Sequence, residues 1–225
     1  MPKKAIVSKD ILYFSLFDAI RGSEGCPFCA LETRAVHRYI RHLLNENVND
    51  LGVRAGLARS KGYCPRHAQT LLSFKDGLGT AILYKDQVTL FLRFLDRLRK
   101  AVAPPFRKRL APDWSAHAPC PACGIEAETA ADCAHTFSIS LRDTAMRKAY
   151  DACPGLCVRH FLLMFEKTRD RQSREYLLRL QERNLQDLVR ELEEFCRKHD
   201  YRFAGEPYEK ERNSWLRAVR IMTGR

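Results

Sequence analysis

The chain has 225 residues, 45% of them hydrophobic, so it is long enough to form one large domain or two small ones. Its formal net charge of +12 favours acidic partners, such as nucleic acid or an acidic protein, although a basic surface can also be inert. No stretch approaches the length of an uncharged apolar span, and the first residues lack the apolar region of a signal sequence. We therefore expect no contact with a membrane.

The cysteine content indicates a reducing environment. Nine cysteines are too sparse for a disulfide scaffold, and their number is odd. In the cytoplasm, paired cysteines bind metal more often than they form disulfides. The composition therefore predicts a cytoplasmic protein that binds metal.

The apolar pattern is helical along most of the chain. Apolar residues recur at helical spacing from Leu31 to Leu43, from Leu78 to Leu95 and from Leu178 to Phe195. A polar or glycine-containing stretch precedes each of the last two stripes, at residues 75–80 and 167–174. No alternating strand pattern stands out, and we predict an all-α fold.

Prolines mark two further boundaries. Residues 104–119 contain four prolines and are expected to form an extended linker, because proline removes a helix donor and restricts the residue before it. Near the end, Pro207 is expected in the first turn of a short helix that carries Trp215, Val219 and Met222 on one side.

A Cys-Pro-x-Cys motif occurs twice, and each copy is followed downstream by Cys-x-x-His. The first set is Cys26, Cys29, Cys64 and His67, and the second is Cys120, Cys123, Cys157 and His160. Three thiols and one imidazole in two close pairs form the ligand set of a closed, four-coordinate zinc site. The sequence therefore predicts one ion per set and two zinc ions per chain.

The duplication extends beyond the ligands. Corresponding residues lie 93 or 94 positions apart, and Glu32, Gly62 and Arg66 recur as Glu126, Gly155 and Arg159. Such a repeat governs the architecture. We expect a duplicated helical repeat with a pseudo-twofold axis, in which one Cys3His metal site braces each half.

The expected organisation follows the chain. It comprises a first repeat at residues 1–103, the linker at 104–119, a second repeat at 120–200, and a C-terminal short helix at 201–225 that packs on the body. We expect the two long helices to pack across the axis in a single merged core.

Each ligand pair is expected at the start of a helix. Proline in Cys-Pro-x-Cys fits the first helical position, and the positive end of the helix dipole favours thiolate over thiol. Gly62 and Gly155 supply the turn before each Cys-x-x-His. A bound ion would then join helix starts that lie far apart in the sequence, so metal binding would contribute to folding.

Charged residues beside the ligands could support the sites. Arg66 and Arg159 are expected to donate to the thiolates or to pair with Glu32 and Glu126, and the alternative is a solvated surface position. Cys196 lies on the last apolar stripe and is expected in the core.

Basic residues in two parts of the chain suggest nucleic acid as an alternative partner. Exposed positions on the first helix and near the linker are Arg34, Arg38, Arg41, Arg97, Lys100, Arg107, Lys108 and Arg109. These side chains could contact phosphates. However, the matching helix of the second repeat has few cations, no base-reading motif is present, and a solvated helix face explains the same pattern.

Two questions of chemistry concern the metal itself. A Cys3His set can also hold an iron–sulfur cluster, and the sequence does not separate this from zinc. Catalysis at the metal is disfavoured, because four protein ligands leave no position for water. The leading hypothesis is a zinc-braced helical scaffold or adaptor that binds a protein partner, and its oligomeric state is open.

The motif set resembles that of an uncharacterised bacterial family that carries a domain-of-unknown-function label. The resemblance rests on the two Cys-Pro-x-Cys and Cys-x-x-His pairs and on the tail from Ser214 to Ala218, and it covers about Phe17 to Gly224. It implies bacterial origin and metal binding, and it brings no activity, substrate or partner.

Overall fold

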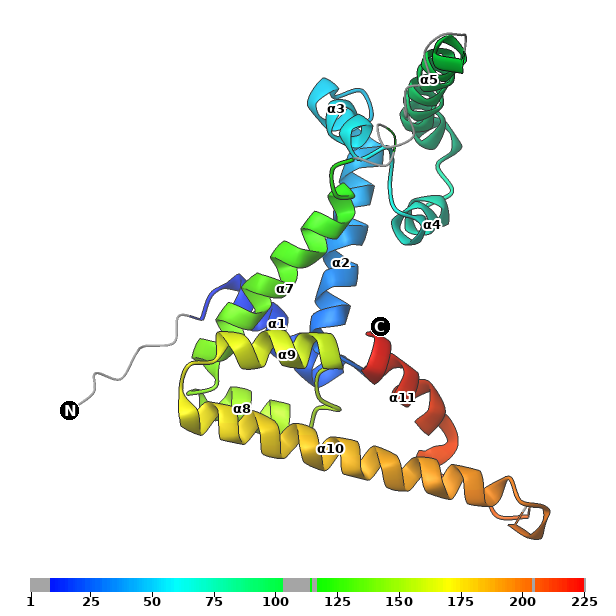
Figure 1. Ribbon diagram of the computed structural model, residues 1–225. Coiled ribbons are helices and arrows are strands. Elements are labelled where there is room, and N and C mark those ends of the chain that lie inside the picture. Colours follow the sequence, from blue (N-terminus) through cyan, green and yellow to red (C-terminus); the bar gives the residue numbers. More distant parts are fainter. Residues whose placement is uncertain (1–8, 103–113, 115–116, 204, 225) are drawn as a thin grey trace. The chain divides into compact units, whose positions relative to one another are not determined.

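The computed structural model describes residues 9–102, 114, 117–203 and 205–224, and every element in these ranges is helical (Figure 1). The elements are α1 (Ile11–Gly22), α2 (Pro27–His42), the π-helical turn η1 (Leu43–Asn47), α3 (Leu51–Arg59), α4 (Pro65–Ser73), α5 (Gly77–Val102), α7 (Pro121–Ser140), α8 (Thr144–Asp151), α9 (Val158–Lys167), α10 (Arg171–Lys198), the 3-10 turns η2 (Tyr201–Phe203) and η3 (Lys210–Asn213), and α11 (Ser214–Thr223). The predicted all-α fold is confirmed. The pseudo-twofold axis stays a prediction, although the order of α2 to α5 recurs in α7 to α10.

The helices begin where the motifs require. α2 starts at Pro27 and α7 at Pro121, so both Cys-Pro-x-Cys motifs place proline at the first helical position. Cys64 and Cys157 are the N-cap residues of α4 and α9, with extended backbone angles that differ by only a few degrees in φ. The two copies therefore build the same local structure.

Glycine is required before each of these caps. Gly62 has a φ of 95° and Gly155 a φ of 97°, a left-handed conformation that costs other residues steric strain. These are the turns that we predicted from the sequence.

The chain divides into two compact units that are not consecutive in sequence. Unit 1 comprises Met1–Thr33 and Glu128–Arg225, and unit 2 comprises Arg34–Ala127. Helices α2 and α7 each begin in one unit and end in the other. Each unit thus takes residues from both halves of the repeat, unlike the consecutive organisation expected from the sequence.

Unit 1 has its own core. Phe137 is fully buried at its centre, with ring contacts to Phe28 at 6.1 Å and to Tyr150 at 4.8 Å between centroids, both edge to face. Leu16 of α1 and Met164 of α9 belong to the same buried cluster. The first turn of α2 therefore packs with helices from the second half of the chain.

Unit 2 has a separate core. Ile40 and Leu43 from α2 and η1 pack in one buried cluster with Leu71 of α4, Leu83 of α5 and Ala122 of α7. The expectation of a single merged core is therefore wrong, because the buried apolar residues form one cluster in each unit.

The apolar stripes locate the long helices but not all their buried residues. In α5, Leu78, Val88 and Leu92 are exposed, whereas Leu83 is buried. Cys196 in α10 is also exposed, so its expected core position is wrong. Helical spacing identifies a face, but the packing of neighbouring helices decides how much of that face is covered.

The C-terminal helix starts later than expected. Residues 210–213 form η3, and α11 begins at Ser214 rather than near Pro207. α11 packs against α9 and α10 within unit 1, and Trp215 and Val219 on it remain exposed. Most of the expected linker, residues 104–113 and 115–116, lies outside the described residues.

In the described ranges, no helix combines the length and the apolar character needed to cross a membrane.

Candidate metal centres

The eight predicted ligands gather into two groups of four. Site A, in unit 1, consists of Cys26, Cys29, Cys157 and His160, and site B, in unit 2, consists of Cys64, His67, Cys120 and Cys123. Within each group the candidate ligand atoms all lie within 4.8 Å of one another. Each group could hold a metal ion.

The grouping differs from the one expected from the sequence, in which each half of the repeat formed its own site. Cys26 and Cys29 join Cys157 and His160 rather than Cys64 and His67. The physical reason lies in α2, a 16-residue helix with a length of about 24 Å. It carries the chain away from the first Cys-Pro-x-Cys motif before the first Cys-x-x-His begins.

Site A is closely packed. Nδ1 of His160 lies 3.3 Å from Sγ of Cys26, 3.4 Å from Sγ of Cys29 and 3.3 Å from Sγ of Cys157. The sulfurs of Cys29 and Cys157 are 3.7 Å apart. All four donors therefore point toward one small volume.

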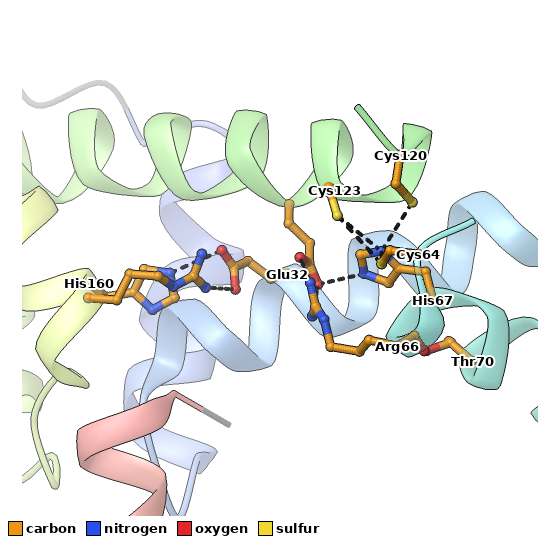
Figure 2. Close-up of polar contacts among 10 residues, drawn as sticks. Glu32, Cys64, Arg66, His67, Thr70, Cys120, Cys123 and His160 are labelled. Carbon is orange, nitrogen blue, oxygen red and sulfur yellow. Dashed lines mark hydrogen bonds and ion pairs between the residues drawn. The ribbon is translucent and has the colours of Figure 1, made fainter. Parts of the chain in front are cut away.

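Site B has nearly the same geometry. Nδ1 of His67 lies 3.3 Å from Sγ of Cys64 and 3.5 Å from Sγ of both Cys120 and Cys123 (Figure 2). The sulfurs of Cys64 and Cys123 are 3.8 Å apart. The two sites thus repeat one arrangement of donors.

A buried glutamate holds the histidine of each site. Oε1 of Glu32 lies 3.0 Å from Nε2 of His160 (Figure 2). Oε1 of Glu126 likewise lies 3.0 Å from Nε2 of His67. Nε2–H then donates to the carboxylate and leaves Nδ1 free to face the sulfurs. The glutamates fix both the tautomer and the orientation of the rings.

An arginine completes each of these chains of contacts. Arg159 pairs with Glu32, and Arg66 donates to both carboxylate oxygens of Glu126. Both arginines pair with one of the two glutamates, but the partners are exchanged relative to pairing within each half, and each pair joins the two halves of the repeat, as the ligands do. Hydrogen bonding to Glu126 raises the pKa of Arg66 and outweighs its partial burial.

The thiols are crowded enough to disfavour several negative charges without a cation. Burial and the neighbouring thiols Cys120 and Cys64 raise the pKa of Cys123 to about 12. In site A, burial and the neighbouring Cys157 and Cys29 raise the pKa of Cys26 well above its usual range. A bound cation compensates this repulsion by binding the thiolates directly.

The sites differ in burial. In site A the cysteines are between 0% and 9% exposed, and Gly224 approaches so closely that a Cβ there would lie 3.6 Å from Sγ of Cys157. In site B, Cys64 and Cys123 are partly exposed. The end of α11 therefore shields site A.

One glutamine near site A was not recognised from the sequence. Gln181 of α10 donates to the carbonyl of Leu156 at 2.9 Å and accepts from its N–H at 3.3 Å, immediately before the ligand Cys157. Its counterpart 94 positions earlier is Gln87. The shared offset with the Cys-Pro-x-Cys motifs was the signal that could have identified the pair.

The residues considered for nucleic acid binding are not brought together as one group of free cations. Arg34, Arg38 and Arg41 are exposed on α2. Lys100 pairs with Asp96 at 2.8 Å, and the guanidinium group of Arg97 lies over the Phe94 ring. Arg107, Lys108 and Arg109 lie outside the described residues.

Comparison with known proteins identifies the family but no activity. The chain is 29% identical over 201 residues to an uncharacterised 23.9 kDa protein encoded in the xynA 3' region of Caldicellulosiruptor sp. (strain Rt8B.4), and the match covers 88% of this chain and 95% of that protein. No solved structure matches the chain. A family model described as a family of unknown function matches residues 7–225, and the chain therefore belongs to the family DUF6062.

Proposed function

We propose that this protein binds two zinc ions in closed Cys3His sites, and that these ions brace a cytoplasmic helical scaffold for a protein partner. The observation that carries the proposal is the spacing of the donors. A tetrahedral zinc ion with Zn–S of about 2.3 Å and Zn–N of about 2.0 Å requires S···S edges of about 3.8 Å and S···N edges of about 3.5 Å. The structure has S···S distances of 3.7 and 3.8 Å and S···N distances of 3.3 to 3.5 Å.

The same spacing favours a single ion over an iron–sulfur cluster. Ligands of a cluster bind different iron atoms and are spread around several metal and sulfide centres. Here all four donors of each site converge within 4.8 Å. Zinc fits this mixed sulfur and nitrogen set at tetrahedral geometry.

A structural role fits the number of ligands. Four protein donors fill the coordination sphere of a tetrahedral ion, whereas a catalytic zinc site keeps one position for water or substrate. Each site also joins the start of one helix to a helix from the other half of the chain. All nine cysteines are free, which agrees with a reducing cytoplasm.

The scaffold role is supported by exposed apolar side chains on α5. Val88 and Leu92 are each 59% exposed and Leu95 is 40% exposed. Apolar residues exposed together on one helix are typical of protein interaction sites.

Elemental analysis of the native protein tests the metal assignment. We expect two zinc ions per chain, with neither iron nor acid-labile sulfide in stoichiometric amounts. Removal of the zinc with a chelator should unfold the protein, as judged by circular dichroism, and added zinc should restore it. Several irons per chain, or a metal-free protein with unchanged folding, would contradict the proposal.

The partner-binding part is tested separately. The wild-type chain is used to capture a partner protein from an extract of its own cells. Leu92→Glu should retain both zinc ions but no longer capture this partner. Leu162→Glu, a change at an exposed position of α9, should still capture it. Equal capture by both variants would exclude the α5 surface.

A further inference from the structure

The positive charge of the chain is concentrated in unit 2. Residues 34–127 contain 16 Lys and Arg against 7 Asp and Glu, a balance of +9 out of the total +12. Unit 1, which is the larger part of the chain, holds the remaining +3. Such an asymmetry marks one unit as the part that meets an acidic partner.

Within unit 2, three exposed arginines lie on one face of α2, and the nearest exposed carboxylate along the chain, Glu46, pairs with His42 at 3.3 Å. Arg34, Arg38 and Arg41 occupy positions i, i+4 and i+7 of α2, which form one stripe about 10 Å long. All three are exposed, and His37 and His42 beside them are exposed as well. From Arg34 to His42 the helix contains no acidic residue. We call Arg34, Arg38 and Arg41 the arginine stripe.

The arginine stripe differs from those cations of the protein that have a carboxylate beside them. Arg54 pairs with Asp86 at 2.6 Å, and Arg171 pairs with Glu175 at 2.8 Å. Among the described residues, no carboxylate lies within ion-pair distance of Arg34, Arg38 or Arg41. Like charges at i and i+4 destabilise a helix, so Arg34 and Arg38 together have a cost, whereas Arg41 in the last turn of α2 is favoured by the helix dipole.

The neighbouring element leaves the stripe open. The Phe74 ring at the end of α4 packs against His37, with ring centroids 5.5 Å apart. This contact is made by an aromatic ring, so it does not neutralise the arginine stripe. Lys75 and Asp76 follow Phe74 directly and carry opposite charges.

The composition of this face indicates the class of partner. Protein interfaces place aromatic and apolar residues at their centre and are depleted of charge there. The exposed face from Arg34 to His42 has arginine and histidine instead. Interfaces with nucleic acid are polar and strongly positive, and arginine is the preferred donor to phosphate oxygens.

We propose that the arginine stripe of α2 binds the phosphate backbone of nucleic acid, without reading its sequence. This goes beyond the zinc scaffold, because the two metal sites could hold their ions whether or not the stripe has a ligand. Each arginine that neutralises a phosphate releases condensed counterions, so the affinity must fall as salt rises.

The test uses the full zinc-loaded chain, a fluorescent duplex DNA, a single-stranded RNA of the same length, and fluorescence anisotropy over a range of salt concentrations. The stripe variant is Arg34→Ala, Arg38→Ala and Arg41→Ala together. The matched control is Arg171→Ala, Arg179→Ala and Arg190→Ala, which removes three exposed arginines and the same charge from α10. Zinc content and circular dichroism confirm that both variants are folded.

We expect the stripe variant to bind at least about tenfold more weakly at low salt. On duplex DNA, the slope of log affinity against log salt concentration should become shallower by about 0.9 for each phosphate that an arginine no longer neutralises. The control should stay within about twofold of the wild type. Equal weakening of both variants, or no salt-dependent binding by the wild type, would overturn the proposal. Competition by polyglutamate as effective as that by unlabelled nucleic acid would overturn it too, and would assign the stripe to an acidic protein.

Discussion

The sulfurs of Cys29 and Cys157 lie 3.7 Å apart, although 128 residues separate them in the chain. This contact distinguishes the observed grouping of ligands from a grouping within each half. Cys29→Ser with Cys157→Ser removes two ligands of site A only, so this double variant should retain one zinc. Cys29→Ser with Cys64→Ser damages both sites and should retain almost none.

The measurement is metal content after gel filtration. If the ligands paired within each half, Cys29 and Cys64 would share an ion. The variant that lacks Cys29 and Cys64 would then retain one zinc, and the variant that lacks Cys29 and Cys157 would retain almost none. That result would contradict the sites described here.

The contact between Glu32 and His160 predicts that removing the carboxylate charge weakens zinc binding at site A. Glu32→Gln keeps the size of the side chain but removes the charge that raises the basicity of the imidazole. We expect zinc to bind about 10-fold more weakly or worse at site A, and Glu126→Gln to do the same at site B. Competition with a chromophoric chelator measures both affinities.

The control for these variants is Glu128→Gln, an exposed residue two positions after Glu126 on α7. It should leave both affinities unchanged. If Glu32→Gln behaves like this control, the glutamates do not act through the histidines.

The unequal burial of the two sites predicts unequal release of metal. Excess chelator should remove zinc in two phases of equal amplitude, with site B first, because Cys64 and Cys123 are partly exposed while the cysteines of site A are buried. Stopped-flow absorbance follows the two phases. Cys29→Ser should leave only the fast phase and Cys123→Ser only the slow one, and the opposite assignment would show that exposure does not control release.

Gln181 should stabilise unit 1 through the turn before Cys157. Gln181→Leu leaves the N–H and C=O of Leu156 without their partner, which should lower the free energy of unfolding by about 1–3 kcal/mol. In Gln87, both amide atoms are buried and have no hydrogen-bond partner among the described residues. Gln87→Leu should therefore cost much less, and denaturant unfolding compares the two variants.

The raised pKa of the Tyr13 hydroxyl should make the stability of the protein depend on pH. This hydroxyl donates to Asp143 at 2.7 Å, and burial together with this carboxylate raises the pKa of Tyr13 to about 12. Tyr13→Phe should cost about 1.5–3 kcal/mol near neutral pH, since the hydrogen bond that it removes involves a charged acceptor.

The sign of the pH effect follows from the raised pKa. In the unfolded chain Tyr13 ionises near pH 10, whereas the folded protein keeps it protonated to about 12. The stabilisation is therefore complete below about pH 10 and decreases as pH rises toward 12. Denaturant unfolding of both proteins over this range should show the advantage of the wild type shrinking, and a constant difference would contradict the assignment.

Much of the local structure could be predicted from the residues alone. Pro27 and Pro121 mark helix starts because proline fits the first helical position, and Gly62 and Gly155 mark turns that need a positive φ. The exposed faces of α5 and α10 were less predictable. Leu78 and Leu178 belong to apolar stripes but are 76% and 45% exposed, because burial depends on neighbouring helices that periodicity does not specify.

The sequence by itself determined the ligand types, the duplicated motifs and the helices that carry them. It did not determine which motif meets which, because two equivalent copies allow a Cys3His set either within each half or between the halves. Tertiary structure decided this through α2, a helix of about 24 Å whose first residues belong to unit 1 and whose last residues belong to unit 2. Cys26 and Cys29 are consequently placed with Cys157 and His160, and each half of the repeat supplies part of both candidate metal centres.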